Sequence, residues 1–401
     1  DIYSYTPDYT FYIHPIIKVG SLILLVLGFT YICLRHNSFK EYKFKPIKTL
    51  IARNLTIFFF LLTFIWISFA FLFSDDYEFS FWDVIDYKRG YAYFLCYVVI
   101  VISILLCTKK QKFVLLELLI FVSIVINLIA IIAYCTEWHP NAYRVPEAAI
   151  FSNRNFYAYY LSITTLLSAA RLYLTKKPYL NIYYAASLII SEFALLISQT
   201  RGAFVGVVVA IVLMLVYFGI RRKFSWKLIL VPAIMIITFL VLEISGITVF
   251  MDRLGLLASD VETATNAASH TEEQVDAVGS GRIAIWKDVI SKIKTSPIVG
   301  LGIGSTLAEH NEYLQIAAWS GIPAALFYIC ALFAMVINLF KKNNQLTDTQ
   351  IVATLAAISY AVQSFFGYAL LQTAPFYIIV LALSLNPNFD KKVQETEPNC
   401  P

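Results

Sequence analysis

Apolar runs long enough to span a membrane alternate with short polar segments along almost the whole chain. A helix needs about 20 mainly apolar residues to cross the hydrocarbon core of a bilayer. Runs of about this length predict eleven spans, at residues 16–34, 51–73, 91–107, 113–135, 156–174, 180–198, 202–220, 227–249, 320–340, 349–366 and 368–385. The pattern therefore predicts an all-α, polytopic membrane protein.

The composition excludes the soluble classes that a chain of 401 residues would otherwise suggest. Hydrophobic residues make up 59% and charged residues only 14%, and the mean hydropathy is +0.70. A soluble domain has about a quarter of its residues charged. The composition also excludes a disordered chain. The six cysteines have no paired spacing, so neither a disulfide framework nor a zinc site is predicted.

Basic residues orient the predicted spans. They follow every odd-numbered span, in the segments 35–50, 108–112, 171–178, 220–227, 341–342 and 391–392. Lysine and arginine accumulate in cytoplasmic loops, so the even-numbered loops are expected outside and the tail 386–401 inside. The same alternation places Asp1 outside. We therefore expect one more span upstream and twelve in the full protein.

One long polar segment interrupts the alternation of spans and short loops and divides the chain. The predicted organisation is a bundle of about eight spans over 1–249, an external periplasmic loop over 250–319, C-terminal spans over 320–385 and the cytoplasmic tail. Long ordered loops on a rigid scaffold are common places for function. The loop 250–319 is therefore the first place to look for a site.

The external loop predicts two helices joined by a glycine-rich turn. Residues 252–278 are expected to form a surface loop or short helix, and Gly279–Gly281 a turn with a helix N-cap. From Arg282 to Ser296-Pro297, apolar residues recur at helical spacing, which predicts an amphipathic helix at the membrane surface with Trp286 at headgroup level. The turn 300–304 would let the backbone approach a ligand. A second helix is expected from about residue 305 through residues 309–313.

Four local patterns occur in order along the chain. They are Phe151-Ser-Asn-Arg-Asn-Phe-Tyr-Ala, Ser198-Gln-Thr-Arg-Gly-Ala, Gly281-Arg-x-x-x-Trp and His310-Asn-Glu-Tyr-Leu. Together they resemble the bacterial O-antigen ligase family, which also contains O-antigen and capsule polymerases. The resemblance covers most of the chain, from about the third span to the end.

This resemblance implies a C-type glycosyltransferase architecture in the bacterial inner membrane. Members transfer a glycan from undecaprenyl diphosphate at the outer leaflet to an acceptor hydroxyl. A ligase uses lipid A-core as acceptor, and a polymerase uses another lipid-linked repeat. The Arg-x-x-x-Trp and His-Asn-x-x-Leu contexts favour the ligase, with the polymerase as the alternative. Membrane lipids are expected partners, and neither a cofactor nor nucleic acid is.

The resemblance also implies roles for individual residues. The family's catalytic positions correspond to Arg201, Arg282 and His310, and its early external basic residues correspond less directly to Lys88 and Arg89. The further predicted substrate-binding residues are Arg154, Asn155, Asn311 and Tyr313.

The chemistry of the reaction is consistent with these residue types. A guanidinium group binds phosphate oxygens in pairs and stays charged, so arginines can hold a diphosphate leaving group where the sequence shows no metal-binding cluster. A histidine can take the proton of the acceptor hydroxyl near neutral pH, with inversion at the anomeric carbon. Structural roles compete with these: Arg201 could reach the headgroups from a helix end, His310 could be a hydrogen-bonded surface residue, and Asn153 and Asn155 could cap span five.

Two other classes remain as alternatives. Glu117 and Glu192 lie inside predicted spans, as proton-relay carboxylates of a lipid-linked oligosaccharide transporter or flippase would. In a transferase we expect both to hydrogen-bond between helices. A transferase that uses polyprenyl monophosphate sugars would instead need Asp75 or Asp76 and could dispense with His310. The abundant tyrosines are expected to form belts at the membrane interfaces.

Overall fold

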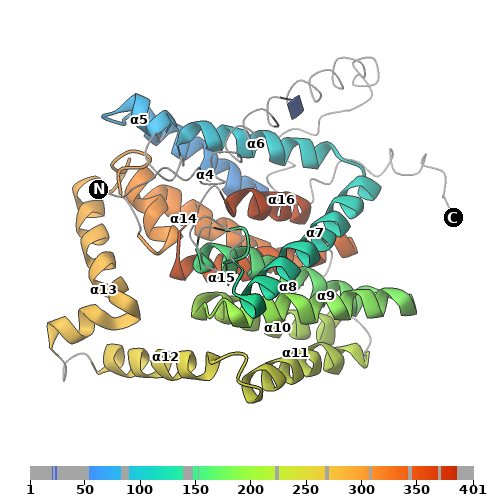
Figure 1. The fold of residues 1–401 in the computed structure, drawn as a ribbon. Coiled ribbons are helices and arrows are strands. Elements are labelled where there is room, and N and C mark those ends of the chain that lie inside the picture. Colours follow the sequence, from blue (N-terminus) through green and yellow to red (C-terminus); the bar gives the residue numbers. More distant parts are fainter. Residues whose placement is uncertain are drawn as a thin grey trace, which may run out of the picture.

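The computed structural model describes residues 20, 23–24, 54–82, 90–138, 148–151, 153–221, 225–266, 271–306, 309–341, 346–368 and 372–385. From residue 54 onward these residues form α-helices and one 3-10 helix, and none of them lies in a strand (Figure 1). The helices are α4 (Leu55–Phe71), α5 (Tyr77–Trp82), α6 (Tyr91–Leu106), α7 (Lys109–Thr136), α8 (Arg154–Leu174), α9 (Pro178–Ile197), α10 (Arg201–Arg221), α11 (Lys227–Ile244), α12 (Phe250–Thr265), α13 (Glu272–Thr295), α14 (Glu312–Phe340), α15 (Asp348–Gln363), η3 (Ser364–Phe366) and α16 (Ala374–Ser384).

The predicted spans from residue 51 onward each coincide with a helix. Six helices are long and apolar enough to cross a membrane: α7, α9, α10, α11, α14, and α15 with η3. Helices α4, α6 and α16 are shorter but equally apolar. The chain is therefore a multi-pass membrane protein. The predicted span 16–34 lies almost wholly outside the described residues.

Helix α8 lies at the centre of the bundle, between α9, α10 and α15 (Figure 1). It is too polar to stand among the six long apolar helices, although the sequence predicted a span here. Several of its hydroxyl groups have partners inside the protein: Ser168 shares a hydrogen bond of 2.8 Å with Ser187 of α9, and Ser162 donates to the carbonyl of Tyr159. Because protein surrounds it on all sides, α8 tolerates polar residues that a lipid-facing helix would not.

Glycines allow α10 to pack closely against α15. A Cβ atom at Gly206 would lie 2.6 Å from the carbonyl oxygen of Ser359, and one at Gly202 would lie 2.6 Å from the Gln363 side chain. The two glycines stand four residues apart, on one face of α10. Small residues at this spacing bring helix backbones together in membranes. This contact holds the first turn of α10, with Arg201, beside η3.

Alanine substitutions in α10 should separate packing from helix propensity. Gly206→Ala should destabilise the protein by about 1–3 kcal/mol, because the methyl group meets a backbone carbonyl that cannot move independently. Gly219→Ala on the same helix meets no atom within 4 Å and should be neutral or slightly stabilising. Thermal unfolding of the purified variants in detergent measures both. Equal melting temperatures for the two variants would contradict the close α10–α15 contact.

The glycine-rich turn at residues 300–304 supplies backbone hydrogen bonds where α14 is interrupted. Helix α14 is interrupted at Gly321 (φ 84°), and Pro323 cannot donate to the carbonyl of Trp319. The N–H of Gly302 donates to that carbonyl at 3.2 Å, and the N–H of Leu301 donates to the carbonyl of Ala318 at 2.8 Å. The N–H of Ile322 in turn donates to Pro297. The turn therefore approaches the backbone of α14, and its approach to a ligand stays a prediction.

The two helices of the external loop differ from the prediction at their N-terminal ends. Helix α13 begins at Glu272, before the predicted turn, and Gly279 (φ 65°) and Gly281 (φ 80°) interrupt its regular geometry. The second helix begins at Glu312 and not near residue 305. Figure 1 shows α12 along one edge of the bundle and α13 along one end. Val289 and Ile293 of α13 are buried against Ala317 and Ala318 of α14, as expected of an amphipathic helix.

The carboxylates inside the predicted spans have different surroundings. Glu117 of α7 pairs with Arg171 of α8 at 2.8 Å and accepts a hydrogen bond of 2.7 Å from Tyr184 of α9. The expected interhelical bonding is confirmed for this residue. Glu192 is 2% exposed, and its Oε2 has no hydrogen-bond partner within the described part of the chain. The interhelical bonding expected of Glu192 is therefore not seen at that atom.

Many tyrosines lie inside the bundle and not in interfacial belts. Tyr157, Tyr159, Tyr160, Tyr184 and Tyr360 are all 2% exposed or less. The expectation of belts is wrong for these residues. Apolar periodicity does not distinguish an interfacial tyrosine from one that faces a neighbouring helix, because both can lie near the end of a span.

Candidate functional site

His310 occupies a tight turn immediately before α14. Its backbone is left-handed (φ 50°), a conformation that is uncommon for residues other than glycine. The next residue, Asn311, is the N-cap of α14, and its Oδ1 accepts hydrogen bonds from the N–H groups of Tyr313 and Leu314, both at 3.0 Å. The cap fixes the start of the helix and therefore the direction in which the chain leaves His310.

The segment before His310 is held by two indole groups. Glu309 is fully buried, and its Oε1 accepts a hydrogen bond from Thr306. Trp319 of α14 donates to Thr306 at 3.0 Å, and Trp286 of α13 donates to the backbone carbonyl of Glu309 at 3.1 Å. Together with the Asn311 cap, these hydrogen bonds hold the turn on both sides of His310.

The His310 imidazole is half-buried in an apolar, positively charged environment. The Tyr368 ring lies edge-on to it at a centroid distance of 5.3 Å. Burial, and then the charge of Arg282, lower the pKa of His310 below its ordinary value. Both effects disfavour the imidazolium, because it would be poorly solvated and would face a like charge. The imidazole is therefore neutral near pH 7, which is the form that accepts a proton.

Arg282 and Trp286 lie one turn apart on α13, on the same face of the helix. The Trp286 ring packs edge-on against Phe365 of η3 at 5.5 Å. Helix α13 thereby contacts both the His310 turn and the C-terminal end of α15. The structure brings Arg282 close enough to His310 for its charge to act on the imidazole, although the two residues are far apart in sequence.

Three other predicted residues, Arg154, Asn155 and Arg201, lie at the same end of the bundle. Asn153 caps α8 by accepting the N–H of Asn155 at 2.8 Å, which confirms the predicted cap. Thr200 donates to Oδ1 of Asn155 at 3.4 Å, so the start of α8, with Arg154, lies beside Arg201 at the start of α10.

An aromatic contact connects this group to the histidine. Phe156 of α8 packs edge-on against Tyr368 at 6.1 Å, and Tyr368 contacts His310. Tyr368 was not predicted as a site residue. A tyrosine that follows a glycine at the end of a span has no pattern that distinguishes it from an interfacial anchor.

The structure gives two predicted binding residues partners within the protein. Asn311 is 3% exposed and uses its Oδ1 as the helix cap. Tyr313 donates its hydroxyl to the carbonyl of Ala361 in α15 at 2.6 Å. Both therefore support the His310 turn. Lys88 and Arg89 lie outside the described residues.

A buried carboxylate lies beneath the turn, among tyrosines. Glu312 is 5% exposed and accepts a hydrogen bond of 3.1 Å from Tyr328, whose hydroxyl also bonds to Tyr377 at 3.0 Å. Tyr360 stacks on Tyr377 at 4.0 Å. This set ties the first turn of α14 to α15 and α16. Within the described residues, no three His, Cys, Asp or Glu side chains are grouped as metal ligands would be.

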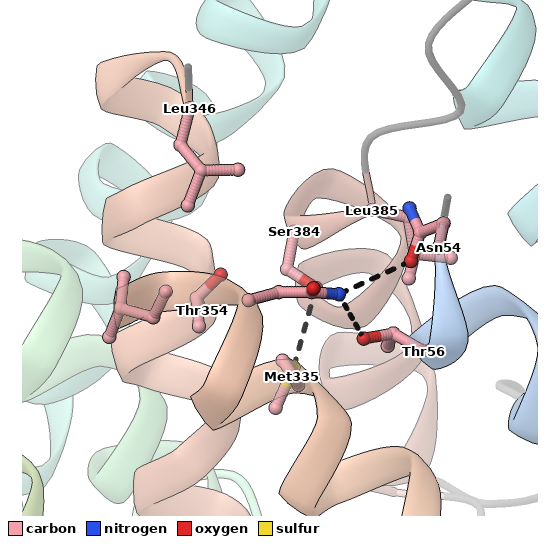
Figure 2. A pocket seen from close by; sticks show the side chains of 9 residues that line it. Asn54, Thr56, Met335, Leu346, Thr354, Ser384 and Leu385 are labelled. Atoms are coloured by element: carbon pink, nitrogen blue, oxygen red, sulfur yellow. Dashed lines mark hydrogen bonds between the residues drawn. The ribbon is translucent and has the colours of Figure 1, made fainter. Parts of the chain in front are cut away.

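Figure 2 shows a small cavity at the other end of the helices. Met335, Asn338 and Leu339 line it from the C-terminal end of α14, where Asn338 donates to Thr56 at 2.8 Å and to Asn54 at 3.4 Å. Its volume of about 20 Å³ is comparable to the space that one water molecule needs. This cavity is therefore too small for a sugar and separate from the His310 turn.

Comparison with known families identifies the region that carries this geometry. Residues 185–329 match the model of the O-antigen ligase family. The chain carries an O-antigen ligase family domain. The match confirms the resemblance over this range, and it includes Arg201, Arg282 and His310. No curated protein matches the chain.

The O-antigen ligase domain indicates a general function. A domain of this family implies a membrane enzyme that transfers glycans in lipopolysaccharide or polysaccharide biosynthesis, as a ligase or a polymerase, with lipid-linked glycans as substrates. The matched range ends inside α14. Helices α8 and α15 lie outside it, yet they contribute Asn155 and support the His310 turn through Ala361.

Proposed function

We propose that the protein is an O-antigen ligase that transfers a glycan from undecaprenyl diphosphate to a hydroxyl of lipid A-core. The observation that carries the proposal is the half-buried His310 in a restrained turn inside the O-antigen ligase domain, with Arg282 near enough for its charge to act on the imidazole. A permanent cation beside a neutral imidazole suits a reaction in which one group receives phosphate charge and the other receives a proton.

The arginines act on the leaving group. As the bond between the anomeric carbon and the donor phosphate oxygen breaks, undecaprenyl diphosphate gains negative charge. Arg282 and Arg201 lie at one end of the bundle, each half-buried, and their guanidinium groups can bind diphosphate oxygens in pairs. Such contacts strengthen where water is excluded, and they favour the transition state because the charge develops there. Arg154 is a third cation at this end.

His310 acts on the acceptor. The acceptor hydroxyl oxygen attacks the anomeric carbon from the side opposite to the leaving diphosphate, and its proton moves to the imidazole. The configuration at the anomeric carbon is thereby inverted. Because the imidazole is neutral near pH 7, His310 accepts this proton without first losing another.

The positions of the helix ends support a periplasmic location for this chemistry. The site is built from the N-terminal ends of α8, α10 and α14 and the C-terminal end of α15. The lysine- and arginine-rich segments 108–112, 171–178 and 220–227 adjoin the opposite ends of α7, α8 and α10. By the positive-inside rule those ends face the cytoplasm. The site therefore faces the outer leaflet, where the glycan donor is displayed.

A transfer assay in lipid nanodiscs tests the proposal. Purified protein is given a single-turnover amount of undecaprenyl-diphosphate glycan with either lipid A-core or a second lipid-linked repeat. A ligase releases undecaprenyl diphosphate and glycosylates lipid A-core. Product on the second repeat alone would reassign the protein as a polymerase. No transfer with either acceptor, together with movement of the intact donor across proteoliposome bilayers, would replace the enzyme by a flippase.

A further inference from the structure

The conformation of the His310 turn depends on contacts made by its neighbours. A left-handed backbone at a residue other than glycine costs of order 1 kcal/mol and persists only where the surroundings impose it. Asn311 fixes the chain after His310 through the cap of α14. Before His310, the carbonyl of Glu309 accepts the indole N–H of Trp286 at 3.1 Å. One of the two restraints therefore comes from a different element, α13.

The same tryptophan controls where Arg282 can lie. Regular helical geometry is interrupted at Gly279 and Gly281, immediately before Arg282. The position of Arg282 therefore depends on contacts that α13 makes on its C-terminal side. Val289 and Ile293 anchor the later turns on α14, and Trp286 stands between these anchors and Arg282. Four helical residues rise about 6 Å, so Trp286 lies one turn from the guanidinium-bearing residue.

Trp286 thus connects the segments that carry the two partners of the site. Its indole nitrogen bonds to the residue before His310, its ring packs on Phe365 of η3, and its helix carries Arg282 one turn away. We propose that Trp286 is a positioning residue that sets the separation between the Arg282 guanidinium and the His310 imidazole. This inference rests on the proposed function, and it assigns the tryptophan of the Arg-x-x-x-Trp pattern a role that the sequence alone does not indicate.

The charge of Arg282 acts on the pKa of His310, so a change in the separation of these two groups can be measured in the pH dependence of transfer. Among the described residues, the titratable and charged groups on the elements around the turn include Arg282, Lys287, Asp288, Glu309, Glu312, Tyr313, Tyr328, Tyr368, Arg154, Tyr159 and Arg201. The carboxylates of Glu309 and Glu312 bond to Thr306 and Tyr328. Arg282 is the charged group that lowers the pKa of His310, after burial. If Arg282 moves away, the pKa of His310 rises, and the acidic limb of the pH–rate profile moves to higher pH.

Trp286→Phe tests the proposal, because it removes the N–H donor and keeps an aromatic ring. Transfer at pH 7 should fall by about 10- to 100-fold, since small misplacements of reacting groups have costs of this size. The acidic limb should move towards that of Arg282→Gln. In the double variant Trp286→Phe/Arg282→Gln the limb should lie where it lies in Arg282→Gln, because the charge that Trp286 positions is absent.

Two further variants separate positioning from folding. Trp66→Phe removes an indole bond of the same kind, 3.2 Å to the carbonyl of Ile298, away from His310, and should leave both transfer and pH profile unchanged. Phe365→Leu weakens the ring contact of Trp286 at a side chain that is 48% exposed, and should move the acidic limb in the same direction by less.

The outcomes distinguish the two proposals. An acidic limb in Trp286→Phe and Phe365→Leu identical to that of the unmodified protein would overturn the positioning role, even if transfer fell. Full transfer by His310→Asn would remove His310 from the mechanism, whereas the absence of transfer by the unmodified protein would overturn the proposed function itself.

Discussion

Replacement of His310 by asparagine should lower single-turnover transfer by about 10²- to 10⁴-fold, the contribution expected of a general base. Asparagine suits this test because position 310 is left-handed (φ 50°), and asparagine tolerates that region better than other residues that bear a side chain. The backbone of the turn, the Asn311 cap and the Trp286 bond are then preserved. Binding of the lipid-linked donor should change little, because the imidazole acts on the acceptor.

His310→Gly provides the matched control for this prediction. Glycine adopts the left-handed conformation without steric cost, so the melting temperature should not fall even though transfer is lost. Added imidazole should restore part of the transfer, because a small base can enter the space that the side chain leaves. Transfer by His310→Asn within about threefold of the unmodified protein, at pH 7 and with saturating acceptor, would remove His310 from the mechanism.

Arg282→Gln should reduce transfer by about 10²- to 10³-fold, because removal of one hydrogen-bond donor that stabilises a developing negative charge has an effect of this size in other enzymes. The loss should appear in kcat, since the diphosphate gains its additional charge only as the glycosidic bond breaks. The variant also removes the charge that lowers the pKa of His310. A base must be neutral to act, so transfer declines as the pH falls through this pKa. The midpoint lies below the ordinary pKa of histidine in the unmodified protein and should move upward in Arg282→Gln.

Lys292→Gln is the control for the removed charge. It removes one positive charge from the same helix, α13. Lys292 forms an exposed salt bridge of 2.8 Å with Asp288, and such a salt bridge contributes little to stability. Neither kcat nor the midpoint should change. A midpoint that moves equally in both variants would show that the net charge of α13, and not its proximity to His310, sets the pKa of the imidazole.

The sequence alone could predict most of the helices, because a membrane imposes a local requirement. Each span must satisfy its own backbone hydrogen bonds and bury apolar side chains over about 20 residues. The Asn153 cap of α8 and the buried face of α13 at Val289 and Ile293 are local patterns of the same kind. The O-antigen ligase domain could also be anticipated from short motifs that include Arg201, Arg282 and His310.

The errors arose where distant segments determine the local backbone. The second external helix begins at Glu312 and not near residue 305, because Thr306 and Glu309 are held by Trp319 and Trp286. The bonds of the glycine-rich turn to the carbonyls of Ala318 and Trp319 could not be predicted either, because these partners cannot be identified from spacing.

What the sequence by itself determined is therefore the class of the protein, most helix positions and the residue types that its chemistry needs. Only the tertiary structure decided that Arg282 comes near enough to His310 for its charge to act on the imidazole, that Trp286 donates to the carbonyl of Glu309, and that the Tyr368 ring contacts the imidazole edge-on. The physical reason is the range of the interactions. The apolar pattern of a segment reflects whether that segment faces lipid, water or protein. The site depends instead on hydrogen bonds, ring contacts and charges between segments far apart along the chain.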